Sequence, residues 1–274
     1  MTSEPLLYEL HDRARDAGVD GYRRMTKAAL LEALHGVEPG PTTVESSVRA
    51  GLGLVTFRGG TENSLSLETL EALAAAAEAL AADESVRLVA LRGGGTRIFS
   101  SGADLKALRG LPGETVAGRG VTALGRISAL GVPTVALLNG HVVGGGIDLA
   151  LACDWRIAVE GAKLRFIHNE LGFTPPWGAT AHLAAIVPRG IAIRLFATCE
   201  LLSAQEARTM GIVDDVVAPQ KLLSRAESLA VRIGRSNRAA LADTMRLLQP
   251  DVSPEEHART FAALWDAKQA TLPA

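Results

Sequence analysis

The sequence predicts an α/β fold, and three observations predict it. Residues 52–57 have the apolar pattern of a strand, and residues 66–82 form an alanine- and leucine-rich amphipathic stretch that is typical of a helix. Residues 87–92 (RLVALR) are almost wholly apolar, as in strands that are buried within a parallel sheet. A β–α–β succession of this kind is typical of an α/β core.

The chain begins with a different pattern. Residues 6–34 predict two short helices, because apolar residues recur at helical spacing and Gly18 and Gly21 interrupt them. Within this stretch, LHDRARDAGVDGYRRMTKAALLEAL resembles the small helix–loop–helix fold found at the N-terminus of transcription terminator Rho and in SAP-type modules. Many such modules bind nucleic acid, but acidic side chains outnumber basic ones here. We therefore expect a docking or solubilising appendage and no nucleic-acid partner.

Three parts of the chain are predicted. Residues 1–36 form the helix–loop–helix appendage, and residues 37–43 form a linker that is rich in proline and glycine. Residues 44–274 form the α/β domain, which ends in helices from about residue 219 onward.

Composition narrows the class of protein. The 274 residues are 47% hydrophobic, which is enough for a sizeable core, and the net charge of −2 gives no attraction to nucleic acid or anionic lipid. Cys153 and Cys199 are the only cysteines, so no disulfide framework is implied. The acidic N-terminus does not resemble a secretory signal, and no apolar run has membrane-spanning length. We expect a soluble, cytoplasmic protein with no membrane partner.

A glycine triplet, Gly144 to Gly146, stands between the apolar run 135–138 and a helical stretch at 147–153. Glycine lets other groups approach the backbone closely, and the start of a helix leaves N–H groups without intrahelical acceptors. Such a junction could hold a developing oxyanion.

Two glycine-centred motifs occur in order, FSSGADLKAL at 99–108 and NGHVVGGGIDLALACDWRIA at 139–158. Together with TENSLSLETLEALAAAAEAL before them and LLSAQEARTMGIVDDVV after them, they resemble the crotonase superfamily of enoyl-CoA hydratases and isomerases over roughly residues 44–240. The resemblance implies a spiral of β–β–α turns with C-terminal trimerisation helices, assembled as a homotrimer or hexamer. It also implies an acyl-CoA or acyl-carrier-protein thioester as substrate, with no further cofactor and no metal.

The resemblance assigns an oxyanion hole to the N–H groups of Ala103 and Gly145. The residues that it implies around the substrate and CoA are Arg97, Ala103, Asp104, Leu105, Lys106, Gly144 and Gly145. A thioester enolate gains most from donors that are held rigidly in place.

The acid–base residues depart from the family pattern. Hydratases of this family hold a water between two glutamates, and ungapped alignment puts Asp148 and His168 at those positions. Histidine titrates near neutrality, so proton transfer is retained in altered geometry; a packed, structural histidine is the alternative. If the segment is extended, Glu170 points the same way as His168 and could orient or replace it. His141 and His182 are predicted to be structural.

Several reactions remain open. Hydration, dehydration or double-bond migration of an enoyl thioester is the default for this superfamily. GFTPPWGAT at 172–180 resembles crotonase-type decarboxylases of polyketide β-branching, and its tryptophan-glycine pair resembles naphthoate synthases. Decarboxylation of a malonyl- or glutaconyl-type thioester is therefore the first alternative, and hydrolysis of a carbon–carbon bond in a β-diketone is another. A non-enzymatic scaffold with an N-terminal binding module is the alternative from a different class.

Overall fold

The predicted α/β class is confirmed, and the main sheet has six strands. A computed structural model describes residues 14, 21–33, 42–59, 62–249 and 251–270. In spatial order the strands are β1 (Thr43–Arg49), β2 (Leu52–Arg58), β3 (Leu88–Gly93), β5 (Thr134–Leu138), β7 (Trp155–Val159) and β10 (Asp215–Val217). All neighbours are parallel except β1 and β2, which form an antiparallel pair at one edge.

A second sheet has four strands. They are β4 (Ile98–Ser100), β6 (His141–Val143), β8 (Lys163–Arg165) and β9 (Leu201–Ser203) in spatial order. Successive pairs along the chain, β3 with β4, β5 with β6 and β7 with β8, each give one strand to each sheet, and helical structure follows every pair. This repeated β–β–α step is the spiral that the motifs imply.

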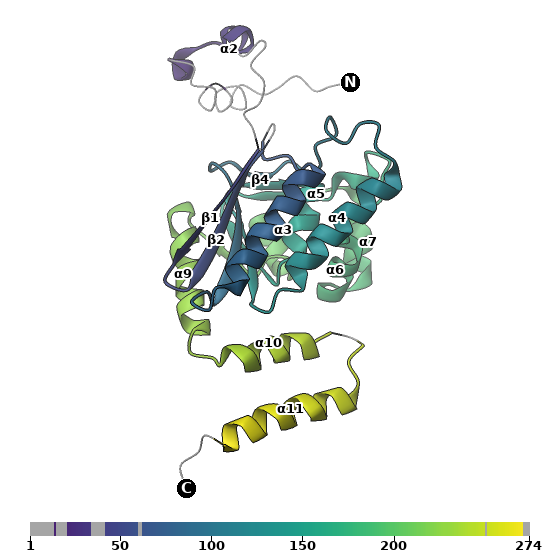
Figure 1. The fold of residues 1–274 in the computed structure, drawn as a ribbon. Coiled ribbons are helices and arrows are strands. Elements are labelled where there is room, and N and C mark those ends of the chain that lie inside the picture. The colour runs from purple at the N-terminus through teal and green to yellow at the C-terminus, as the bar shows by residue number, and fades with distance from the viewer. Residues whose placement is uncertain (1–13, 15–20, 34–41, 60–61, 250, 271–274) are drawn as a thin grey trace.

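Helices α3 to α9 lie around the two sheets, while α10 and α11 extend away from them (Figure 1). The α-helices are α2 (Lys27–Ala33), α3 (Leu67–Ala82), α4 (Gly113–Ser128), α5 (Gly145–Leu151), α6 (Ala179–Ile186), α7 (Arg189–Thr198), α8 (Ala204–Thr209), α9 (Leu222–Ile233), α10 (Arg238–Leu247) and α11 (Pro254–Gln269). The 3₁₀ helices are η1 (Tyr22–Arg24), η2 (Ile167–Asn169) and η3 (Pro219–Lys221). Among the helices within these described ranges, none is both long and apolar enough to cross a membrane.

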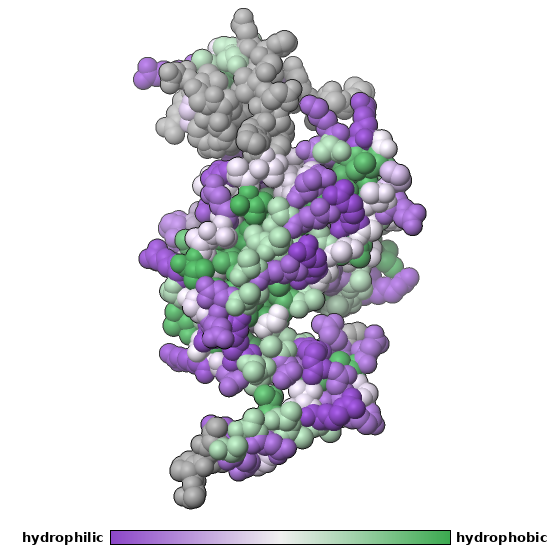
Figure 2. All heavy atoms as spheres, viewed as in Figure 1, coloured by the Kyte–Doolittle hydropathy of each residue, from purple (hydrophilic) through white to green (hydrophobic). Residues whose placement is uncertain are grey.

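Burial explains why the central strands are apolar along their whole length. Every residue of β5 is buried, and so is every residue of β3 except Arg92. Helix α3 buries one face, including Leu70, Leu73 and Ala77, and lies beside α4. On the outer face of this helix pair hydrophilic side chains gather (Figure 2), so the core lies beneath α3 and α4.

Helix α4 begins earlier than the sequence predicts. The sequence predicts a helix near residues 122–130, but α4 begins at Gly113. Most of the predicted N-terminal helix–loop–helix and of the linker lies outside the described residues. In the part that is described, Leu30 of α2 is buried with Ala14, and Tyr22 and Met25 pack against them.

Candidate functional site

The backbone N–H groups of Ala103 and Gly145 lie close together. A methyl group at Gly145 would be 3.0 Å from Ala103 N, and one at Gly102 would be 3.0 Å from Gly145 N. In the parallel bridge beside Ala103, Leu65 N donates to Gly102 O at 2.8 Å and Asp104 N donates to Leu65 O at 2.9 Å. The two hydrogen bonds of this bridge are made by Gly102 and Asp104, the neighbours of Ala103 in the chain. Gly145 is the first residue of α5, and within the described chain neither N–H has a protein acceptor.

A short polar network holds the loop that carries Ala103. Asn63 adopts a left-handed conformation with φ 57°, and its amide donates to Gly94 O at 2.9 Å and to Ile98 O at 3.1 Å. Ser100 Oγ donates to Asn63 O at 2.8 Å and accepts from Gly102 N at 3.1 Å. All of these groups are wholly or partly buried, so the loop is positioned by bonds that water does not weaken much.

Asp148 and His168 form a buried pair one helical turn from Gly145. Asp148 Oδ2 lies 3.0 Å from His168 Nε2, while Oδ1 accepts N–H bonds from Trp177 at 3.1 Å and Ala179 at 3.2 Å. Asp148 is completely buried, and both of its carboxyl oxygens have hydrogen-bond partners. A carboxylate can only accept hydrogen bonds, so an ionised Asp148 fixes the proton of a neutral His168 imidazole on Nε2. Its Nδ1 is buried and has no hydrogen-bond partner in the described part of the chain.

Glu170 lies apart from this pair. The condition for Glu170 to point the same way as His168, an extended segment, is not met, because residues Ile167–Asn169 form the 3₁₀ helix η2. The turn sends the Glu170 side chain to Arg165, whose Nη2 is 2.6 Å from Glu170 Oε2, and half of the glutamate side chain is exposed. The structure therefore brings His168 to Asp148 and turns Glu170 toward the surface.

The indole of Trp177 packs against Gly145, the middle glycine of the triplet. A methyl group at Gly145 would come within 2.4 Å of Trp177 Cζ3, and one at Gly120 of α4 within 2.1 Å of Trp177 Cδ1. Its Nε1–H donates to Val116 O at 3.0 Å. Trp177 is only 1% exposed, so the ring fills the space between α4 and the start of α5 completely.

Two further histidines have a lowered pKa. Burial lowers the pKa of His182 below its ordinary value, and Arg156 adds to that effect while Asp148 opposes it. Burial also lowers the pKa of His141, helped by nearby cations that include Lys163. His141 Nδ1 accepts the N–H of Lys163 at 3.1 Å, which gives that histidine a structural role.

The residues expected beside CoA lie around the loop of Ala103. Arg97 is 3.6 Å from Glu62 in an ion pair with about a quarter of its side chain exposed. Asp104 is used within the loop, because its Oδ1 accepts the N–H of Lys106 at 3.1 Å. The side chains of Leu105 and Lys106 are exposed. Among the described residues, no group of three His, Cys, Asp or Glu side chains could hold a metal ion.

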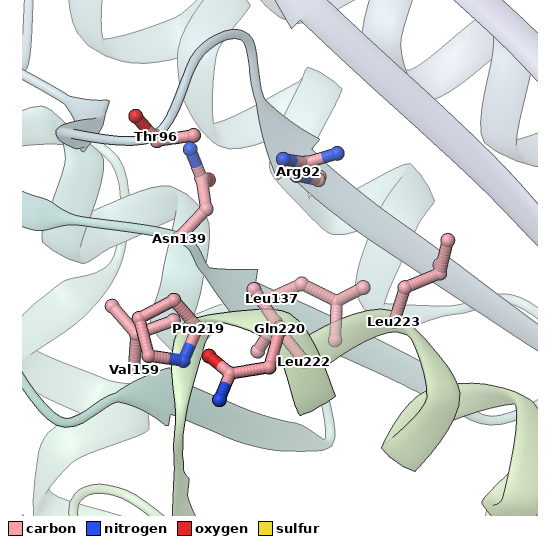
Figure 3. A pocket seen from close by; sticks show the side chains of 9 residues that line it. All are labelled: Arg92, Thr96, Leu137, Asn139, Val159, Pro219, Gln220, Leu222 and Leu223. Carbon is pink, nitrogen blue, oxygen red and sulfur yellow. The ribbon is translucent and has the colours of Figure 1, made fainter.

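One cavity of about 100 Å³ lies elsewhere, between the ends of β3, β5 and β7 and the start of α9 (Figure 3). Its lining residues are Arg92, Thr96, Leu137, Asn139, Val159, Pro219, Gln220, Leu222 and Leu223. Burial lowers the pKa of Arg92, and the neighbouring Arg58 lowers it further. The cavity lining does not include Ala103, Gly145, Asp148 or His168.

The sequence analysis missed the contributions of Asn63 and Gly120. Asparagine is among the few residues that readily adopt a left-handed conformation, so its place just before the predicted helix was a usable signal. Gly120 gave no signal, because its partner, the Trp177 ring, comes from a distant part of the chain.

Comparison with known proteins shows the family of this chain. The family model for enoyl-CoA hydratase/isomerase matches residues 47–270. A crotonyl-CoA hydratase of Syntrophomonas wolfei is 36% identical over 176 residues, which cover 62% of this chain and 67% of that protein. Among solved structures, Pseudomonas aeruginosa DspI superposes with a TM-score of 0.76 at 26% identity, covering 84% of this chain and 92% of that one. An enoyl-CoA hydratase of Bacillus anthracis gives 0.73 at 28% identity, covering 85% and 92%. The chain belongs to the enoyl-CoA hydratase/isomerase family.

Proposed function

We propose that this chain adds water to, or removes it from, an enoyl-CoA thioester, through an enolate held by the N–H groups of Ala103 and Gly145. The observation that carries the proposal is the proximity of these two backbone nitrogens, one of them on the helix that also carries Asp148 of the buried Asp148–His168 pair. Membership of the family and the name of the Syntrophomonas relative support the same chemistry.

The two N–H groups act on the thioester oxygen. Attack of water at the β-carbon of an enoyl thioester moves negative charge onto the carbonyl oxygen, which is where fixed donors stabilise it. Removing one such donor typically costs about 3–4 kcal/mol of transition-state stabilisation. The asparagine network behind Ala103 and the indole behind Gly145 keep both donors from moving when charge develops.

His168 transfers the proton and Asp148 positions it. With Nε2–H donating to Asp148, the Nδ1 lone pair takes a proton from water and returns one to the α-carbon of the enolate. Asp148 keeps the imidazole in that tautomer and stabilises its charged form. Because both carboxylate oxygens are already engaged, Asp148 is a positioning residue here.

Decarboxylation of a malonyl- or glutaconyl-type thioester is the second candidate. The hydrogen bonds of Asp148 favour decarboxylation. Its Oδ1 already accepts two backbone N–H groups, so Asp148 is not free to hold the water molecule that hydration requires. Loss of carbon dioxide requires only the enolate-stabilising N–H groups and one proton donor, which His168 supplies.

A panel of thioesters monitored by mass spectrometry separates the reactions. Crotonyl-CoA that gains the mass of water supports the proposed function, and loss of carbon dioxide from malonyl-CoA supports the second candidate. An unchanged mass with a shifted absorbance identifies double-bond migration. If the full-length chain converts no thioester of the panel, whether on CoA or on acyl-carrier protein, the proposed function is wrong.

A further inference from the structure

The cavity between the ends of β3, β5 and β7 and the start of α9 is lined by a cation that has no counter-ion. This cation is Arg92 (Figure 3). Within the described part of the chain its guanidinium makes one hydrogen bond, from Nη2 to Gly95 O at 3.2 Å, and its Nε is buried without a partner. A guanidinium has five N–H donors, so the protein uses only part of the hydrogen-bonding capacity of Arg92.

A second cation lies beside the first. Arg58 is the last residue of β2, the strand that pairs with β3, and a methyl group at Gly94 would overlap Arg58 Cγ and be 2.9 Å from its Nη1. The charge of Arg58 is close enough to add to the effect of burial on the pKa of Arg92. Neither arginine forms an ion pair with a carboxylate of the described residues. Charges that are partly removed from water are normally paired, so an anion bound at Arg92 would offset an unfavourable arrangement.

The rest of the cavity is mainly apolar. Figure 3 shows Arg92 on one side of the cavity and the side chains of Val159, Pro219 and Leu222 on the other. Among the described residues that line it, Arg92 alone is charged. The volume of about 100 Å³ is several times the roughly 10–15 Å³ that one water molecule needs. The cavity can therefore hold a molecule of several non-hydrogen atoms.

The combination of one guanidinium and apolar walls selects a class of ligand. The planar fork of arginine matches a carboxylate, to which it donates two parallel hydrogen bonds. The apolar walls suit a short hydrocarbon tail, whereas inorganic phosphate would place oxygens against side chains that cannot hydrogen-bond to them. We propose that this cavity is a binding site for a small monocarboxylate with a short apolar tail, whose carboxylate is held by Arg92. The inference does not depend on the proposed function, because the lining includes neither nitrogen of the oxyanion site nor the Asp148–His168 pair.

Isothermal titration of the full chain with sodium butyrate, in a buffer free of phosphate and of other carboxylates, tests the site. We expect a dissociation constant of about 1 mM or below, which is a reasonable affinity for so small a ligand. Butyramide has the same shape without the charge, and inorganic phosphate has the charge without the tail. Each should bind at least about tenfold more weakly than butyrate, because each lacks one of the two interactions.

Two matched variants locate the binding. Arg92→Met keeps the unbranched apolar stem and removes the guanidinium, so butyrate should bind about 10- to 100-fold more weakly. Arg87→Met is the control, because it removes the same charge just before the opposite end of β3 and should leave the affinity unchanged. Circular dichroism checks that both variants are folded. If Arg92→Met does not fold, Arg92→Lys keeps the charge without the planar fork and should weaken butyrate binding by a smaller factor.

The outcomes decide the proposal without reference to catalysis. A wild type that does not bind butyrate, or a folded Arg92→Met that binds it as tightly as the wild type, would overturn the site. Equal affinity of the wild type for phosphate and butyrate would overturn the choice of a carboxylate with an apolar tail. A chain that binds no butyrate and still hydrates crotonyl-CoA would lose this site and keep the proposed function.

Discussion

At the scale of single residues, Asp148 and His168 divide the work that a pair of like carboxylates could share. Aspartate at position 148 is short, and its oxygens are taken up by two backbone N–H groups and the imidazole. The Asp148 carboxylate is also completely buried. The imidazole is then the group of the pair with an unused nitrogen, which is Nδ1.

Replacing His168 with glutamine tests this division. If His168 transfers the proton, the rate should fall by about 10²–10⁴, the usual contribution of a positioned acid or base. A folded variant that keeps the wild-type rate would make His168 a packed structural residue.

Asp148→Asn tests whether Asp148 positions the imidazole of His168. The asparagine amide cannot accept from His168 Nε2–H and from the Trp177 N–H in the same way, so the imidazole loses its fixed tautomer. We expect kcat to fall while KM changes little, as is typical when only the orientation of a base is lost. A large increase in KM with unchanged kcat would contradict a role in proton transfer.

The oxyanion site can be tested by removing a backbone donor. Gly145→Pro and Ala103→Pro each delete one N–H, and each should lower kcat by about 10²–10³. Gly145→Ala is the matched control at that position, because it keeps the N–H and adds the same Cβ, which would meet Trp177 Cζ3 at 2.4 Å. Circular dichroism and thermal unfolding confirm that the variants remain folded. A folded proline variant at either position with near-normal turnover would remove that N–H from the mechanism.

At the scale of elements, the glycines of α4 show why sequence reasoning placed this helix too late. Gly113, Gly118, Gly120 and Gly125 all lie within it, and glycine weakens a helix by roughly 1 kcal/mol relative to alanine. Propensity therefore predicts a loop where the structure has a helix. One of these glycines is required by packing, since Gly120 faces the Trp177 ring.

Alanine substitutions within α4 should separate packing from propensity. Gly120→Ala should destabilise the protein by about 1–3 kcal/mol, because its Cβ would overlap the indole. Gly118→Ala and Gly125→Ala should stabilise it by up to about 1 kcal/mol, because neither Cβ meets another atom within 4 Å. Chemical denaturation measures all three. Equal effects at the three positions would mean that Trp177 does not constrain α4.

The same contrast explains how far the fold and the candidate site could be predicted. Buried parallel strands such as β3 and β5 are continuous apolar runs, so they stand out in the sequence. The resemblance to the hydratases, by ungapped alignment, singled out Asp148 and His168, and the structure joins these by a hydrogen bond of 3.0 Å. The direction of Glu170 depends on a single 3₁₀ turn, and the reach of Trp177 depends on tertiary packing; neither leaves a local pattern.

At the scale of the whole molecule, the two histidines with lowered pKa make stability depend on pH. Burial favours the neutral forms of His141 and His182 in the folded chain, so the unfolded chain binds protons at higher pH. The free energy of unfolding should therefore fall as the pH drops below about 6.5, where the histidines of the unfolded chain become protonated. Above this pH the contribution of the two histidines to stability is complete. His141→Asn keeps an acceptor for Lys163 N–H and removes one titration. Urea titrations between about pH 5 and 7 should show that the free energy of unfolding depends less on pH in this variant than in the wild type. An unchanged dependence on pH would exclude His141 as a contributor.

The C-terminal helices form an arm that leaves the body of the molecule (Figure 1). Neither α10 nor α11 has a buried residue, and a helix with no buried face gains little stability from packing. Arg238 ties the start of α10 to the end of α3 through the carbonyls of Asp83 and Val86. Arg246 pairs with Glu256 and so joins α10 to α11.

An apolar pair on α11 has the character of an interface. Phe261 and Trp265 stack with ring centroids 5.8 Å apart, and they are 65% and 52% exposed. Aromatic side chains that protrude on an arm of this kind are typical of contacts between subunits. We expect the arm to pack on a second copy of the chain in a trimer or hexamer.

Replacing Phe261 and Trp265 together with serine tests the assembly. Without the two rings the arm loses the largest apolar surface that it presents, so the variant should dissociate to monomers at micromolar concentration in light scattering. Leu201→Ser is the control, because Leu201 is 59% exposed on β9, away from the arm, and should leave the mass unchanged. A wild-type chain that is already monomeric would mean that the aromatic pair contacts something other than a second copy. A double variant that keeps the wild-type oligomer would place the interface elsewhere on the molecule.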